Sequence, residues 1–269
     1  MRTFALSSIL LVGLSIPTLA ADTEKLQSAL GHLPESILAS PRADLAHFVD
    51  LTVLYPDSGD EFSPKRLARA RLASLMRPLE AFRAAGPQNW VAKAGTSLAS
   101  VQFFLSHGRQ PEQVIVWGLE SKAAAAELAQ TLRERDFEPL DNGVIGNGEP
   151  LVMNPAQRDI GNPWRSKVGA ASFVKEQGPS ILQAGIPELV TSSRNVSGGG
   201  AASQILSTAL HGFTGVADGQ TILQAVLVSP VLGMKGLDPS SVFSETKSVA
   251  ELQSRLAEQV KNSGQGLPP

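Results

Sequence analysis

The sequence contains no cysteine, and this absence excludes several classes of protein. A small disulfide-stabilised scaffold, a thiol nucleophile and a metal site built on cysteine are all ruled out. Aromatic side chains are also scarce, with one Tyr and three Trp in 269 residues. This composition disfavours a carbohydrate-binding platform, which needs several exposed aromatic rings.

The chain also lacks an excess of basic residues. It carries 23 Lys plus Arg against 25 Asp plus Glu, for a formal net charge of −2. A nucleic-acid-binding protein normally shows a strongly basic balance, because its surface must neutralise phosphates. The composition therefore argues against a nucleic-acid partner.

Long apolar runs are scarce, and the one at the N-terminus has the features of a cleavable export signal. Arg2 supplies a positive charge, residues 4–14 (FALSSILLVGL) are apolar, and residues 17–21 end in small side chains. The run is shorter than the roughly 20 residues that span a bilayer. We therefore expect removal of residues 1–21 and a periplasmic mature chain with no stable membrane insertion. A lipid-anchored form is excluded because no cysteine follows the run.

The stretch from Val114 to Asn154 shows the clearest changes of hydrophobic period. Residues 114–119 form a short apolar run with the composition of a buried strand. Ser121 can then cap a helix that runs to Arg135. The predicted buried face of this helix consists of Ala125, Leu128 and Leu132.

Two turn sequences follow that helix, and they flank short apolar segments at 144–145 and 151–153. This pattern predicts a tight hairpin. Upstream, residues 101–106 are predicted to form a strand that pairs antiparallel with 114–119 across a short loop. The expected fold class is α+β, with an antiparallel or mixed sheet and packed helices.

The chain divides into a signal segment and two regions of similar character. We expect an N-terminal α+β module over 22–174, a C-terminal α+β module over 175–264, and a loose tail over 265–269. Residues 36–39 (SILA) and 180–183 (SILQ) each follow a proline-containing turn. This short echo leaves open two related α/β sandwich modules that join near Val174, as an alternative to a single irregular domain.

A long helix is predicted to start at Ser63-Pro64, because proline is favoured in the first helical turn. Pro78 lies inside the same apolar pattern, so we expect a kink or a break at Arg77. The basic residues of this segment are interpreted as a solvated helix face, with contact to anionic lipids or an acidic partner as the alternative. They are Lys65, Arg66, Arg69, Arg71 and Arg77.

No complete catalytic or metal-binding motif is present. The four histidines form no HExxH pattern, and the nearest approach to a nucleophile elbow, at 95–99, lacks its final glycine. The SxxK matches at 172–175 and 244–247 lack the accompanying motifs. The acidic loop 57–61 does not have the spacing of a calcium loop. We therefore assign no catalytic residue, expect neither a metal nor a cofactor, and favour a non-enzymatic protein.

Five residues are the candidate ligand contacts. His107 stands beside a glycine at a predicted strand end, where functional side chains are often found. Trp164 and Arg165 follow a proline in a predicted loop, and Trp164 is expected to be partly exposed. Gly198 and Gly199 precede a predicted helix, whose free N–H groups could meet an anion.

The sequence leaves three functional hypotheses. The leading one is an exported, non-catalytic protein that binds another envelope component or assembles with itself as a homo-oligomer. The second is a small-solute-binding protein with its ligand cleft between the two modules. The third is a hydrolase that uses His107 with an acidic partner, which is the least favoured.

Overall fold

A computed structural model of the chain describes 11–17, 24–34, 37, 45–54, 76–191, 204–210, 220–228 and the single positions 251, 254 and 258. Gly198, Gly199 and the acidic loop 57–61, which the sequence analysis singled out, lie outside them.

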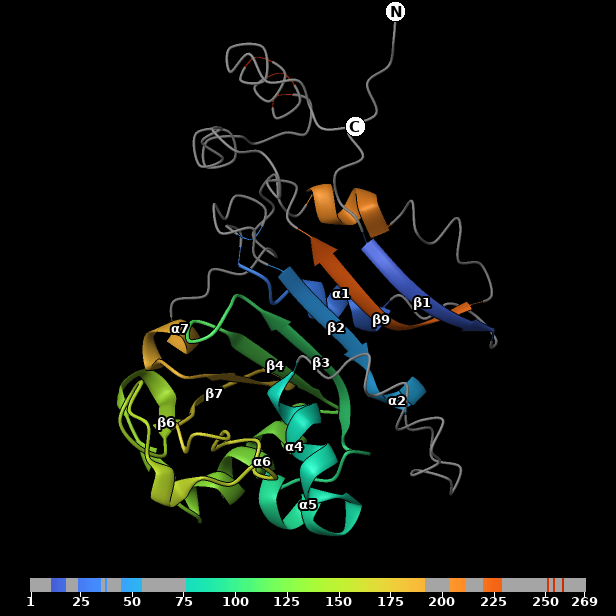
Figure 1. Ribbon diagram of the computed structural model, residues 1–269. Helices are drawn as coiled ribbons and strands as arrows, with labels where there is room; N and C mark the ends of the chain where they lie inside the picture. Colours follow the sequence, from blue (N-terminus) through green and yellow to red (C-terminus); the bar gives the residue numbers. More distant parts are fainter. Residues whose placement is uncertain are drawn as a thin grey trace, which may run out of the picture.

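The described strands form one nine-stranded sheet in which every neighbouring pair is antiparallel, in the order β1-β9-β2-β3-β4-β8-β7-β6-β5 (Figure 1). The predicted α+β class is confirmed. The strands are β1 (Leu11–Pro17), β2 (Leu45–Asp50), β3 (Val101–His107), β4 (Val114–Leu119), β5 (Glu138–Pro139), β6 (Val144–Gly146), β7 (Phe173–Gln177), β8 (Ser180–Ala184) and β9 (Gln220–Val228).

Helices cover both faces of this sheet, so the molecule has two apolar cores. One core receives side chains from α2 (Leu51–Leu54), α4 (Arg77–Ala85), α5 (Pro87–Ala94) and α6 (Lys122–Arg133). The other receives side chains from α1 (Glu24–Leu30), α7 (Pro187–Thr191) and a helix over 204–210. Figure 1 shows α4, α5 and α6 gathered beside β3 and β4, with β1 and β9 at the opposite end of the sheet.

The β3–β4 hairpin is the centre of the sheet, and it was predicted correctly. Successive side chains of a strand point to opposite faces, so Phe104 enters the α4–α6 core while its neighbour Phe103 enters the other. Phe103 lies directly over Gly118 on β4, where a Cβ would stand 2.1 Å from its ring. A larger residue than glycine at position 118 would displace this ring.

The helix after β4 also forms as predicted. The Ser121 side chain accepts a hydrogen bond from the Ala124 N–H at 3.1 Å and caps α6. The predicted face is buried, since Ala125, Leu128 and Leu132 are each at most 1% exposed. A helix, α4, begins at Arg77 with Pro78 in its first turn, whereas the predicted helix start at Ser63-Pro64 lies outside the described residues.

Two segments differ from what their apolar pattern predicts. The alternation of residues 45–54 (LAHFVDLTVL) predicts one strand, but β2 ends at Asp50 and a helical turn, α2, follows. The buried Asp50 carboxylate accepts hydrogen bonds from the Thr52 N–H and hydroxyl at 2.8 and 2.7 Å, which turns the chain. Residues 151–153 are an exposed loop, because β6 pairs with β5 and β7 instead.

The predicted boundary between the two modules falls inside β7, which pairs with β6 on one side and β8 on the other. Strands from both halves of the chain belong to the same sheet, since β9 lies between β1 and β2. The duplication of a module remains a prediction.

Residues 11–17, part of the predicted export signal, form β1 at one edge of the sheet. Every residue of β1 pairs with β9, with one register shift, from Leu11 opposite Leu227 to Pro17 opposite Gln220. None of the helices in the described ranges has the length and apolar character needed to span a bilayer.

Candidate functional site

The predicted ligand contacts that the structure describes do not gather at one site. His107 is the last residue of β3, is 8% exposed, and stands opposite Ala46 and Val114 in the ladder. It lines none of the three cavities found among the described residues, whereas Arg165 lines one of them. A shared site for His107 and Arg165 therefore has no support in the geometry.

Trp164 is buried, and the expectation that it is partly exposed was wrong. It is 1% exposed and stacks on Trp117, with ring centroids 4.5 Å apart and planes inclined by 14°. Trp117 stacks in turn on Trp90 at 6.1 Å. The indole N–H of Trp164 donates to the Ala94 carbonyl at 2.9 Å. Its role is to fix the loop after residue 159 to the end of α5.

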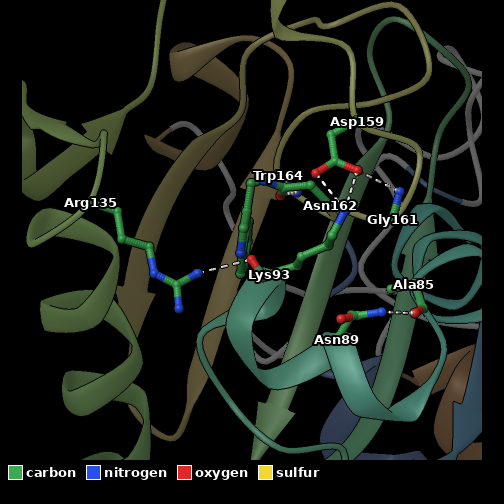
Figure 2. Close-up of polar contacts among 8 residues, drawn as sticks. All are labelled: Ala85, Asn89, Lys93, Arg135, Asp159, Gly161, Asn162 and Trp164. Atoms are coloured by element: carbon green, nitrogen blue, oxygen red, sulfur yellow. Dashed lines mark hydrogen bonds and ion pairs between the residues drawn. The ribbon is translucent and has the colours of Figure 1, made fainter.

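That loop is attached to α5 by several polar contacts (Figure 2). Lys93 Nζ pairs with the two carboxylate oxygens of Asp159 at 2.6 and 2.7 Å. Arg135, just after α6, donates to the Lys93 carbonyl at 3.0 Å and so satisfies one carbonyl at the C-terminus of α5. A Cβ at Gly161 would stand 3.0 Å from Ala85, so the loop also lies close against α4.

A chain of buried polar side chains runs from the tryptophan stack to α4. Gln183 in β8 accepts from the Trp117 indole N–H at 2.9 Å and donates to the Pro163 carbonyl at 2.8 Å. The same amide group donates to Ser172 Oγ at 3.0 Å. Ser172 Oγ also accepts from Arg77 Nη1 at 3.1 Å. Because each link is buried or half-buried, this chain fixes the position of the Arg77 guanidinium.

Arg77 lines the largest of the three cavities, with a volume of about 380 Å³. Its wall comes from α4, from the β3–β4 loop and from the 160–170 segment. The charged lining residues are Arg77, Glu80 and Lys167. All lining residues fall within 77–170, so this cavity lies inside the predicted N-terminal module.

Arg77 has unusual electrostatic surroundings for a cation in a protein. Burial lowers the pKa of its guanidinium below the ordinary value, while the Glu80 carboxylate opposes that shift. Among the residues that the structure describes, Arg77 has no ion-pair partner within 4.0 Å, and its hydrogen bond goes to a neutral hydroxyl. A half-buried cation without an ion-pair partner loses part of its hydration with little compensation, so this arrangement needs an explanation. Of the five basic residues interpreted as a solvated helix face, Lys65, Arg66, Arg69 and Arg71 lie outside the described residues, and Arg77 is half-buried rather than fully exposed.

Arg165 lines a second cavity of about 250 Å³, and both of its terminal guanidinium nitrogens have an acceptor. Its guanidinium donates to Gln157 Oε1 at 2.6 Å and pairs with the Asp136 carboxylate. Gly169 closes the wall, since a Cβ there would stand 1.8 Å from the Asn154 carbonyl oxygen. Arg165 therefore acts as a connection between α6 and the loop.

The loop beside this second cavity carries three consecutive exposed apolar side chains, two of which are the most exposed large apolar residues in the described part of the chain. Leu151, Val152 and Met153 are 55%, 48% and 70% exposed, and we call these three residues the 151–153 patch. Leu151 has a φ of 62°, a left-handed conformation that a leucine rarely adopts.

The geometry offers no catalytic arrangement at the motifs considered above. Ser172 is fully buried, and in extended backbone Lys175 three residues later points to the opposite face of the sheet. Within the described ranges no three His, Asp or Glu side chains gather in a way that would hold a metal ion. Comparison of the chain with protein-family models, curated proteins and solved structures finds no match.

Proposed function

We propose that the protein is an exported, non-catalytic binding protein that docks an envelope protein on the 151–153 patch. The observation that carries this proposal is the run of three neighbouring apolar side chains, each about half exposed or more. Single exposed apolar residues are common on protein surfaces, whereas a contiguous group marks a contact surface more often.

The backbone of the patch supports the same reading. Leu151 adopts a conformation that costs on the order of 1 kcal/mol for a residue with a side chain, and such strain concentrates at functional sites. The loop is also held by Asn154, whose side chain accepts from the Ala156 N–H at 3.2 Å. A rigid apolar surface loses little conformational entropy when a partner binds.

Export is the second part of the proposal, and it rests on the sequence of residues 1–21. We expect the protein isolated from its own periplasm to begin at Ala21 or Asp22. Mass spectrometry of the intact chain measures this directly. A periplasmic protein that still begins at Met1 would rule out the cleavable signal.

The docking surface is tested by a photo-crosslinking residue, p-benzoyl-phenylalanine, placed at Met153 in the producing cells. We expect one discrete adduct, heavier than the chain by the mass of another polypeptide. The matched control places the same residue at Glu127, an exposed position on α6, and should give no such adduct.

A second variant makes the result specific to the patch. Leu151→Asp, combined with the crosslinker at Met153, should abolish the adduct because a charge is introduced into the apolar contact. An adduct of exactly two chain masses would show self-association in place of an envelope partner. If Met153 gives no adduct, or if Leu151→Asp leaves the adduct unchanged, the docking surface is wrong.

A further inference from the structure

The cavity beside Arg77 has the properties of a binding site for an anion. The guanidinium is held in place from behind, since Ser172 Oγ accepts one of its hydrogen bonds and is itself fixed by Gln183. An arginine has five N–H donors, and a single hydroxyl leaves most of them without an acceptor. The remaining donors are available to a ligand in the cavity that Arg77 lines.

The charges around the cavity set the charge of the ligand. Arg77 and Lys167 are the cations in the lining and Glu80 is the anion, so the net charge of the wall is +1. A ligand with one negative charge would neutralise it. A dianion would exceed it, and its second charge would be repelled by Glu80.

The size and the remaining lining residues describe the rest of the ligand. A volume of about 380 Å³ is at the small end of the roughly 300–1,000 Å³ typical of small-molecule sites. Ile160, Val168 and Ala170 provide apolar surface, and Gln113 and Asn162 provide amide groups. Such a wall suits a short aliphatic body attached to the charged group.

We propose that this cavity binds a small organic monocarboxylate, whose carboxylate pairs with Arg77 and whose aliphatic part contacts Ile160 and Val168. The planar guanidinium matches a carboxylate in a two-point geometry, which gives orientation as well as attraction. Lys167, exposed at the mouth, adds a second positive charge. This site is separate from the 151–153 patch, because none of those three residues lines the cavity.

The experiment measures binding of isovalerate to the full chain by saturation-transfer NMR and by shifts of backbone amide signals. Isovalerate at millimolar concentration should give saturable transfer, with amide shifts confined to residues 77–81, 110–113 and 160–170. Its neutral isostere, isovaleramide, should bind at least tenfold more weakly, because a charge-assisted hydrogen bond is lost. Inorganic phosphate should not displace isovalerate.

Two variants locate the site. Arg77→Met keeps the length of the side chain and removes the charge, and should weaken isovalerate binding at least tenfold. The matched control, Arg133→Met on the exposed face of α6, should bind as the wild type does. Lys167→Met, an exposed substitution with no expected effect on folding, should weaken binding a few-fold and tests the site if Arg77→Met does not fold.

Several outcomes would overturn the proposal. These are no saturable transfer to isovalerate, equal binding of isovaleramide, displacement by phosphate, or amide shifts that cluster around Arg165 rather than Arg77. Binding that survives both Arg77→Met and Lys167→Met would overturn it as well. Loss of the crosslink at Met153 would contradict the proposed docking function and would leave this site unaffected.

Discussion

Arg77 and Arg165 line two cavities that both receive residues from the 160–171 segment. Their guanidinium groups differ in the partners that they contact. Arg165 is 7% exposed and pairs with the carboxylate of Asp136, which is itself 52% exposed. Arg77 meets a neutral hydroxyl instead. A buried arginine with a structural role is paired with a carboxylate of the same chain. An arginine that binds a ligand pairs with an anionic group of that ligand instead. The contrast separates a structural arginine from a candidate binding residue.

The largest expected effect comes from Gly169 in the wall of the cavity that Arg165 lines. Gly169→Ala should destabilise the protein by about 3–5 kcal/mol, because the new Cβ would collide with the Asn154 carbonyl and φ is +71°. Urea denaturation followed by far-UV circular dichroism measures this. Gly178→Ala is the matched control, since its φ is +59° and its Cβ meets nothing within 4 Å. A similar cost at both positions would show that the close contact does not matter.

Disrupting the buried polar chain should affect Arg77 and spare Arg165. Gln183→Leu removes the acceptor of the Trp117 indole and the donor to the Pro163 carbonyl, leaving two buried groups unsatisfied. We expect a loss of about 2–4 kcal/mol in the free energy of unfolding, and weaker isovalerate binding. Gln130→Leu on exposed α6 is the control, with an expected change within about 0.5 kcal/mol. If Gln183→Leu is as stable as the wild type, the chain of buried hydrogen bonds contributes nothing to the free energy of unfolding.

The direct comparison of the two arginines should give a smaller effect with a defined order. Arg165→Met is expected to lose about 1–2 kcal/mol of stability, discounted because Asp136 is half exposed. Arg77→Met should be neutral or slightly stabilising without ligand, since an unpaired desolvated charge is removed. Thermal unfolding by calorimetry, in buffer free of carboxylates, ranks the two variants. The interpretation is wrong if Arg77→Met is the more damaging substitution.

The smallest expected effect is the change of stability with pH. It should not alter the difference between Arg77 and Arg165. Burial lowers the pKa of His32 and of His47 below the ordinary value of a histidine. The unfolded chain therefore binds more protons than the folded chain as the pH falls through about 6.5. Stability should decrease slightly as the pH falls from roughly 7 to 5.

His32→Gln should reduce the slope of stability against pH. The order of Arg165→Met and Arg77→Met should stay the same across this range, because no histidine lines either cavity. A reversal of that order with pH would show that a titrating group controls one of the two sites.

Local sequence rules predicted those elements that local contacts determine. The helix α6 could be read from Ser121 and its apolar face, and the start of α4 from Pro78. The rules failed where partners distant in the sequence decide the outcome. Residues 151–153 form a short apolar segment next to a turn sequence, as a strand of a hairpin would. They do not pair with β6, because β6 pairs with β7, which begins 27 residues after β6 ends. Asp50 ends β2 through its own side chain, against the apolar pattern of the segment.

The candidate site was harder to predict than the fold. Trp164 was expected at the surface because it follows Pro163, yet it completes a stack formed by residues more than 40 positions earlier. Arg77 was one of five basic residues in a segment, and their spacing alone does not distinguish it from the others. The signal that could have singled it out is its position directly before Pro78, at the first turn of a new helix. Its contact with Ser172, 95 residues away, could not be read from the sequence.

The tryptophan stack has a consequence for optical studies of this protein. All three tryptophans of the chain belong to it, with centroids 4.5 and 6.1 Å apart and nearly parallel planes. At these separations the indole transitions couple, so the folded chain should show an exciton couplet in circular dichroism. Tryptophan emission will report only on the α4–α6 side of the sheet. Opening of the sheet at β9, where no tryptophan lies, should pass without a change in fluorescence.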